Sequence, residues 1–148
     1  MAYKHFVVVR DGETYGYQII DAEITDASVY SLENFGADVN FVYFCGIDEA
    51  GHAYGILGDE YLTAIQRVDA HLTRLHGAIT KRAESLGEKW LLVMVTDHGH
   101  RDEGGHGGDS EQERASFVIA HGIGRENPQW KLDIEPHHLT DLLLAERA

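Results

Sequence analysis

The chain has 148 residues, 43% of them hydrophobic, and a formal charge of −13 from 12 basic and 25 acidic side chains. This length and apolar share fit one globular domain, residues 1–148, with a single core. A chain this acidic has no general attraction for nucleic acid or anionic membranes, so a phosphate-bearing ligand must be held by local positive charge, such as metal ions.

The amino-terminal part of the sequence predicts a β-hairpin. Residues 6–9 are a run rich in β-branched side chains, and residues 14–20 can form a returning strand. The dipeptide Asp11-Gly12 between them is a strong turn signal. We therefore expect the chain to open with a two-stranded ribbon.

A helix and another strand are predicted next. Thr25 or Asp26 can cap the helix, and Gly36 ends it. Residues 39–45 then have the composition of a strand. Cys45 is the only cysteine, which excludes an intrachain disulfide and a cysteine-based zinc site and favours a buried structural thiol.

The long segment 59–85 has a clear helical pattern. Its apolar residues recur at alternating steps of four and three: Tyr61, Ile65, Val68, Leu72, Leu75 and Ile79. Gly87 ends this helix, and strands follow at residues 90–95 and 116–120. The resulting β-α-β-α-β order predicts an α/β domain with a mainly parallel sheet flanked by helices.

Two of the predicted strands are followed by Asp/His pairs. Asp48 and His52 come after residues 39–45 at a spacing of four, which places both on one side of a helical turn. Asp97 and His98 come directly after residues 90–95, in a glycine-rich loop that also contains His106. Carboxylate oxygen and imidazole nitrogen are ligands of Zn²⁺ and similar divalent ions, and glycines let the backbone fold closely around them.

The carboxyl ends of parallel strands meet at one edge of a sheet, so we expect the two Asp/His pairs to face a shared crevice. Either pair alone is typical of a solvated cap and a surface histidine. Together with the glycine loop they favour a metal site.

The remaining polar residues have simpler interpretations. We expect surface or helix-cap roles for His71, His76, His137 and His138, and leave His5 and His121 unassigned. Asp102, Glu103, Glu111 and Glu113 are expected to form a solvated acidic rim. Arg114 can pair with that rim or with a substrate. No apolar run has signal-peptide or membrane-spanning length, so we expect a soluble, cytoplasmic protein.

The motifs Asp48-x-x-x-His52, residues 96–99 and residues 105–108 resemble the metal-binding signatures of the alkaline phosphatase superfamily, in particular its type I phosphodiesterase/nucleotide pyrophosphatase branch. The resemblance spans about residues 15–120. It implies a parallel-sheet α/β core holding two metal ions, usually zinc, with Mn or Mg as alternatives. Asp48, His52 and His106 would bind one ion, and Asp97 and His98 the other. His100 and Arg101 match no ligand position and are expected to orient ligands by hydrogen bonds.

The sequence also departs from this family. The resemblance implies a further Asp ligand and a Thr or Ser nucleophile from an amino-terminal half, and nothing before Asp48 matches that half. Residues 134–144 resemble the start of the family's closing helix. We therefore interpret the chain as the carboxyl-terminal portion of such an enzyme, with an incomplete second metal site and an open, apolar sheet edge that favours a homodimer.

Two functions follow from the resemblance. The first is a metal-dependent hydrolase of phosphodiesters or phosphomonoesters acting on a small phosphate ester, with a related mutase or phosphonate hydrolase as variants. It would be active only if another chain or metal-bound hydroxide replaces the missing nucleophile. The second is a non-catalytic metal-binding remnant or assembly module.

Overall fold

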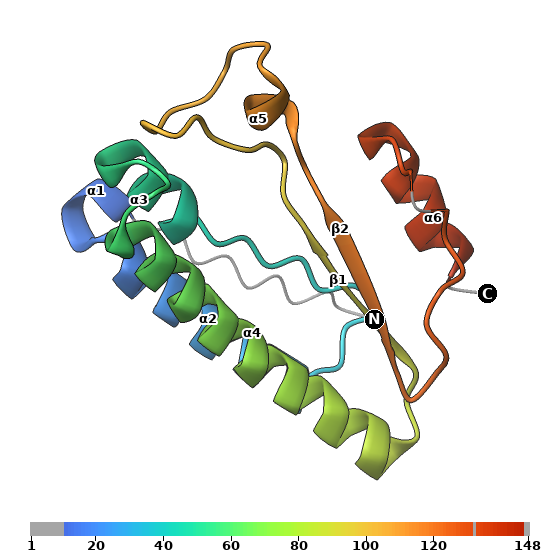
Figure 1. Ribbon diagram of the computed structural model, residues 1–148. Coiled ribbons are helices and arrows are strands. Elements are labelled where there is room, and N and C mark those ends of the chain that lie inside the picture. The colour runs from blue at the N-terminus through green and yellow to red at the C-terminus, as the bar shows by residue number, and fades with distance from the viewer. Residues whose placement is uncertain (1–10, 132, 147–148) are drawn as a thin grey trace.

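The computed structural model describes residues 11–131 and 133–146. The helices and strands of these residues are α1 (Gly12–Tyr15), α2 (Tyr17–Asn34), α3 (Gly46–Tyr54), α4 (Asp59–Leu86), β1 (Trp90–Val95), α5 (Glu111–Arg114), β2 (Val118–Ile123), the 3₁₀ turn η1 (Pro136–His138) and α6 (Leu139–Ala145). The described part is thus a mixed α/β structure in which α2 and α4 lie side by side and the two strands pair (Figure 1). Among these helices none is both long and apolar enough to cross a membrane.

The predicted β-hairpin is wrong in the part that the structure describes. Residues 14–20 are helical, in α1 and α2, while residues 6–9 lie outside the described residues. Asp11 caps α1 by accepting a hydrogen bond from the backbone N–H of Glu13, so the supposed turn starts a helix. Gly16, with φ of +85°, separates α1 from α2. The β-branched and aromatic residues of this stretch therefore follow the helix that tertiary packing selects.

Helix α2 starts earlier than the sequence predicts. Thr25 does not cap it but lies buried in its interior, where the hydroxyl donates to the carbonyl of Asp21 at 2.7 Å. The buried residues Asp21, Thr25 and Leu32 recur at steps of four and seven, so one face of a continuous helix is packed. The residue predicted to cap the helix therefore lies inside it.

Residues 39–45, which the sequence predicts as a strand, form an extended segment that pairs with neither β1 nor β2 and runs into α3 (Figure 1). Its side chains nevertheless alternate as in a strand. Phe41 and Tyr43 are exposed, whereas Val42 and Phe44 pack against the core. The extended conformation agrees with the predicted strand, but within the described residues this segment forms no ladder of hydrogen bonds.

The long helix and the strand after it are confirmed. Helix α4 spans Asp59–Leu86, and Gly87 ends it in the left-handed conformation with φ of +68°. Leu75 and Ile79 form the core with Leu32 of α2 and Ile123 of β2. β1 occupies the predicted residues, so periodicity and capping were sufficient for this part of the chain.

The sheet differs from the predicted parallel order. β1 and β2 pair antiparallel, with Trp90 opposite Ile123 and Val95 opposite Val118. β2 also begins two residues later than predicted and extends to Ile123. The connection over residues 96–117 contains only the four-residue α5, too little to carry the chain back along the strand, so β2 starts where β1 ends. A mainly parallel sheet therefore does not describe the strands of this structure.

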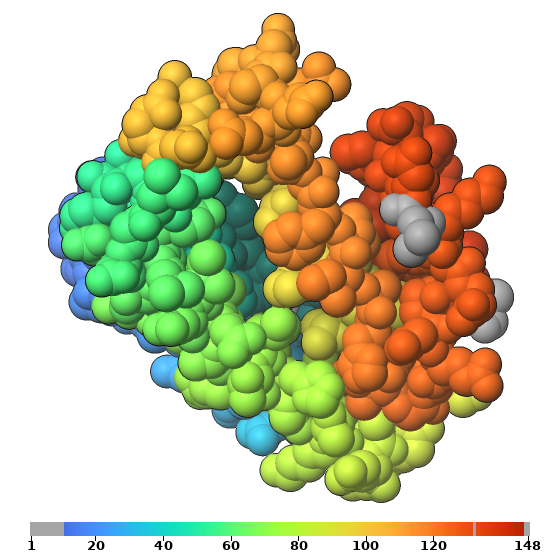
Figure 2. Space-filling view, in the orientation of Figure 1, coloured from blue at the N-terminus to red at the C-terminus, as the bar shows by residue number. Residues whose placement is uncertain are grey.

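The carboxyl-terminal segment turns back beside β2. The expected closing helix begins in η1 and α6, and Figure 1 shows α6 standing apart from the α2–α4 pair. Arg125 and Trp130 both bond the side chain of Glu146 and so hold the end of α6. A hollow is left between the loop before β2 and this segment, as the space-filling view shows (Figure 2).

Candidate metal centre

Helix α3 carries Asp48 and His52, and a buried carboxylate fixes its start. Asp21 accepts hydrogen bonds from the backbone N–H groups of Gly46 at 2.9 Å and Cys45 at 3.2 Å. Burial raises the pKa of Asp21, although these two hydrogen bonds act in the opposite direction. A side chain on Gly46 would bring its Cβ to 2.6 Å from Asp21 Oδ2, so only glycine allows this approach. No local pattern in the sequence indicates this role for Asp21.

Glu113 holds the glycine loop that contains His106. Its carboxylate accepts from the N–H of Gly108 at 2.9 Å and from the hydroxyl of Ser110 at 2.5 Å, and it completes the capping box of α5. The hydrogen bond from Ser110, followed by that from Gly108, lowers the pKa of Glu113. Glu113 is 7% exposed, so its prediction as part of a solvated rim is wrong. Arg101 pairs with this carboxylate and not with a ligand of the centre.

The structure brings Asp48, His52 and His106 together. Nε2 of His52 lies 3.8 Å from Oδ2 of Asp48, and Nε2 of His106 lies 3.5 Å from Oδ1. One ligand atom from each of the three residues lies within 4.8 Å of the others. Two segments that are far apart in the sequence thus supply one cluster, as the shared-crevice prediction required.

His98 joins the same cluster from the start of the loop. Its Nε2 lies 3.9 Å from Asp48 Oδ1 and 3.7 Å from Asp97 Oδ1, and its ring stacks on that of His106 at 3.7 Å between centroids. Nδ1 of His98 is 3.1 Å from the carbonyl oxygen of Gly99, which can only accept. The proton therefore sits on Nδ1, and Nε2 is left with a free lone pair facing the carboxylates.

Asp97 is the most exposed of the predicted ligands. Its side chain is 76% exposed, and it belongs to neither of the compact groups built on Asp48 and histidines. Its carboxylate accepts from the backbone N–H of His98 at 3.1 Å. Asp97 therefore lies at the rim of the cluster, next to His98.

These residues fit a divalent metal ion. Ligand bonds of about 2.0–2.2 Å place adjacent ligand atoms of a tetrahedral site about 3.3–3.6 Å apart. The distances of 3.5 Å to His106, 3.8 Å to His52 and 3.9 Å to His98 from Asp48 lie at or slightly above this range. Imidazole and carboxylate donors suit zinc and also accept manganese.

Cys45 forms a third group with Asp48 and Glu49 that meets the same distance criterion. Burial raises the pKa of the Cys45 thiol, which lies 3.8 Å from a carboxylate oxygen of Glu49. A protonated thiol is a poor metal ligand, because the thiolate is the binding form. The half-buried Cys45 is thus better explained as a structural thiol, although it is less buried than the sequence suggested.

Several of the described histidines lie outside the cluster. His71 stacks on Phe44, His76 stacks on His121, and His137 lies against His138. None of these rings belongs to a ligand group in the described residues. The surface or helix-cap roles predicted for His71, His76, His137 and His138 stay predictions, and His121 had no assigned role.

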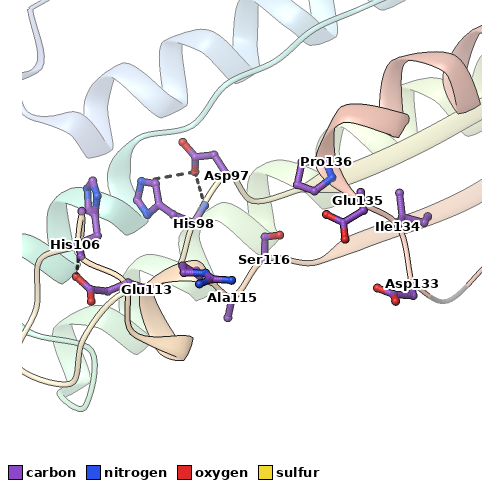
Figure 3. A pocket seen from close by; sticks show the side chains of 13 residues that line it. Asp97, His98, His106, Glu113, Ala115, Ser116, Asp133, Ile134, Glu135 and Pro136 are labelled. Carbon is purple, nitrogen blue, oxygen red and sulfur yellow. Dashed lines mark hydrogen bonds and ion pairs between the residues drawn. The ribbon is translucent and has the colours of Figure 1, made fainter.

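A cleft of about 740 Å³ opens beside Asp97, His98 and His106. Figure 3 shows Asp97 and His98 at one end and the segment from Asp133 to Pro136 at the other. Arg114 lines the same cleft. The cleft therefore extends from the histidines of the glycine loop to the carboxyl-terminal segment.

Comparison with known proteins agrees with this geometry. A family profile described as type I phosphodiesterase / nucleotide pyrophosphatase matches residues 13–111, which include Asp48, His52, Asp97, His98 and His106. The chain belongs to this family, within the alkaline phosphatase superfamily.

Several proteins similar to the chain are GPI ethanolamine phosphate transferases. It is 29% identical over 75% of its length to GPI ethanolamine phosphate transferase 1 of Yarrowia lipolytica, and 31% identical over 75% to the catalytic subunit of GPI ethanolamine phosphate transferase 3 of Homo sapiens. It is 26% identical over 69% to GPI ethanolamine phosphate transferase 2 of Schizosaccharomyces pombe. The chain spans 12%, 9% and 14% of these relatives, respectively. No solved structure matches it significantly.

Proposed function

We propose that this chain is the metal-binding part of an enzyme that acts on phosphate esters. It would hold divalent metal, two zinc ions in the full site, through Asp48, His52, Asp97, His98 and His106. The observation that carries the proposal is the convergence of Asp48 and His52 on α3 with His98 and His106 on the glycine loop. Manganese or magnesium are alternatives for the same donors. In this interpretation the structure is a fragment of an alkaline-phosphatase-like core.

The chain's own residues prepare the centre before any ligand binds. Gly99 sets the tautomer of His98, Asp21 fixes the start of α3, and Glu113 fixes the glycine loop. Bound metal would polarise a phosphoryl oxygen and stabilise the leaving oxygen of a phosphate ester. In a chain of charge −13, the ion also supplies the positive charge that draws a phosphate to this face.

The acceptor of the phosphoryl group distinguishes hydrolysis from transfer. Water would make the enzyme a phosphodiesterase or pyrophosphatase, whereas an alcohol would make it a transferase, as the names of its relatives state for those proteins. Asp133 and Glu135 line the same cleft, at the end away from Asp97 and His98. Their carboxylates would suit a cationic group on the ester, such as the ammonium of ethanolamine phosphate, so we propose this as the substrate class.

Three threonine hydroxyl groups that could be considered as nucleophiles have structural partners. Thr14 donates to Asp11, Thr25 donates to the carbonyl of Asp21, and Thr96 accepts from the backbone N–H of Phe117. This observation favours the second candidate function, a metal-binding remnant or assembly module without turnover. Ser116 lines the cleft and is the first hydroxyl to replace if turnover is found.

Metal content and hydrolysis test the proposal together. We expect elemental analysis to find bound metal after equilibration with Zn²⁺ or Mn²⁺, and little or no hydrolysis of bis-p-nitrophenyl phosphate. Absence of bound metal would contradict the proposed centre. Robust turnover that survives repurification and is lost in Asp97→Asn would contradict the expectation that this chain does not supply the nucleophile. The activities of Ser116→Ala and Thr96→Ala would then identify the reacting hydroxyl.

Ligand binding tests the substrate class. Calorimetry on the zinc-loaded chain should show tighter binding of phosphoethanolamine than of inorganic phosphate. Asp133→Asn with Glu135→Gln should reduce this preference and leave phosphate binding unchanged. Equal affinities in the unmodified chain would contradict a cationic substrate.

We also propose that the chain forms a homodimer through its exposed extended segment. Phe41 is 88% exposed and Val39 is 69% exposed, although both are apolar. Sedimentation equilibrium should give a dimer that Phe41→Glu disrupts. A monomer at high concentration would contradict this arrangement.

A further inference from the structure

His100 lies deeper than the other histidines of the cluster. Its side chain is 5% exposed, compared with 44% for His52 and 29% for His106. Its Nε2 lies 2.8 Å from Oδ1 of Asp48. Ligand atoms of His100, Asp48 and His98 lie within 4.8 Å of one another, so His100 is close enough to share a metal ion with them. The individual distance to Asp48 and the hydrogen bonds of the ring distinguish a ligand from a hydrogen-bond donor.

The distance to Asp48 is that of a hydrogen bond. Two ligands of one tetrahedral zinc ion lie about 3.3–3.6 Å apart, whereas N–H···O bonds span about 2.7–3.2 Å. The 2.8 Å separation falls in the second range, and the three other imidazoles, at 3.5–3.9 Å from Asp48, do not. His100 is therefore placed to bond the carboxylate and not to share an ion with it.

The second ring nitrogen gives an independent argument. Nδ1 of His100 is buried and has no hydrogen-bond partner among the described residues. If Nε2 bound a metal, the proton of the neutral ring would sit on Nδ1 and a buried N–H would lack an acceptor, which is rare in folded proteins. With the proton on Nε2, the ring donates to Asp48 and leaves only a lone pair without a partner.

A slot in α3 holds the ring in this position. Gly51 lies between Asp48 and His52 in sequence, and a Cβ built on it would come within 2.8 Å of Cε1, 3.0 Å of Nδ1 and 3.1 Å of Nε2 of His100. Only a residue without a side chain leaves room for the imidazole against the helix. The slot fixes both the ring and, through it, the carboxylate.

We propose that His100 is a positioning residue, which donates a hydrogen bond from Nε2 to Oδ1 of Asp48 and so holds this carboxylate in its metal-binding orientation. The remaining lone pairs of Asp48 then face His52, His98 and His106. Residues that orient a metal ligand in this way contribute about 10–100-fold to metal affinity. This inference rests on the proposed metal centre.

Cobalt titration of the full chain tests the role. His100→Leu, which removes the donor, should weaken Co²⁺ affinity about 10–100-fold and leave the visible spectrum of the saturated protein unchanged, because no ligand is lost. His100→Gln, which restores an N–H at a similar reach, should bind nearly as the unmodified chain does. His121→Leu, a substitution at an exposed histidine of β2, is the matched control and should have no effect.

Gly51→Ala tests the slot while leaving every polar group in place. It should weaken Co²⁺ binding as His100→Leu does, whereas Gly77→Ala in α4, where a Cβ meets open space, should not. Circular dichroism of the EDTA-treated variants establishes that they are folded. If Gly51→Ala binds Co²⁺ as tightly as the unmodified chain, the slot does not position the carboxylate.

Histidine ¹⁵N spectra of the metal-free chain give a readout that does not depend on metal. His100 should show the Nε2–H tautomer, and the Nδ1–H tautomer would overturn the inference. A changed spectrum in cobalt-saturated His100→Leu, or unchanged affinity, would also overturn it while leaving the proposed function intact. An unmodified chain that takes up no cobalt would overturn the proposed function and this role together.

Discussion

The two ends of α4 lie in regions that are stabilised by different kinds of interaction. Near its carboxyl end, Leu75, Ala78 and Ile79 pack on Leu32 and Ile123 in the apolar core. Near its amino end, the glycine loop and α3 meet through histidines and carboxylates, and Asp21 and Glu113 supply the fixed points. The first region is held by burial and the second by hydrogen bonds and charge.

Because of this difference, substitutions in one region should change stability and substitutions in the other should change metal affinity. Loss of apolar contacts should lower the free energy of unfolding with little change in the metal centre. Loss of a ligand should remove metal affinity while leaving the core packed. Each variant below is chosen to test whether the two regions respond independently.

The largest effect is expected in the core. Leu75→Ala should lower the free energy of unfolding by about 2–5 kcal/mol, because a buried leucine leaves a cavity. Urea denaturation in EDTA measures it, with Leu62→Ala, 53% exposed on the same helix, as the control. A folded Leu75→Ala chain that had lost zinc affinity at low temperature would show that the two regions are coupled.

The next effect should be confined to the metal centre. Asp48→Asn should weaken zinc affinity at least about 100-fold, since Asp48 is common to both histidine groups and the amide has lost the charge. His52→Ala should likewise reduce occupancy more than His71→Ala. Calorimetric zinc titration compares these variants with Asp69→Asn, an exposed site on α4. Unchanged binding in Asp48→Asn would place the metal elsewhere.

The two regions should also respond to pH with opposite signs. In the core region, the hydrogen bond from Arg82 lowers the pKa of Glu88, so its contribution to stability is present above the unfolded pKa and is lost as pH falls through the folded one. At the centre, burial raises the pKa of Asp21, so its contribution is present at low pH and is lost as pH rises through the raised pKa.

Urea denaturation in EDTA at pH 4 and pH 7 measures both signs. The stability advantage of the unmodified chain over Glu88→Gln should be larger at pH 7. Its advantage over Asp21→Asn should be larger at pH 4. The same sign for both variants would contradict the proposed difference between the two carboxylates.

The smallest effect is a gain. Gly77→Ala should raise the free energy of unfolding by about 0.5–1 kcal/mol, because Gly77 lies inside α4 with open space around the added methyl group. Thermal denaturation detects it, and Gly51→Ala serves as the crowded counterpart. A destabilised Gly77→Ala would mean that α4 meets another surface at this position.

The sequence predicted what depends on periodicity and on local end signals. The pattern over residues 59–85, the stop at Gly87 and the strand at residues 90–95 are all confirmed. Strand ends predicted that the two Asp/His pairs share a crevice, and the family resemblance implied that Asp48 meets His106. The structure brings Asp48 close to both His98 and His106, although the reasoning from strand ends assumed a parallel sheet. The glycine loop is part of a short connection between two antiparallel strands, and this connection contains only α5 and no crossover helix.

Other features depend on contacts that no local pattern encodes. Residues 14–20 favour a strand by composition, but Asp21, Thr25 and Leu32 bury one helical face. The burial of Glu113 depends on the loop closing around it. The sequence analysis already expected His100 to orient a ligand, but which carboxylate it faces and the slot at Gly51 that holds its ring come only from the structure.

The most direct test of the metal centre is thermal denaturation with Zn²⁺ and with EDTA at pH 7.5 and pH 5. Binding to the folded state alone should stabilise it by about 2.7 kcal/mol when free zinc is a hundredfold above its dissociation constant, so Tm should rise with zinc at pH 7.5. At pH 5 the difference should shrink, because histidine must be neutral to bind and an ordinary imidazole protonates near pH ~6.5. Identical midpoints with zinc and with EDTA at pH 7.5 would contradict the metal centre.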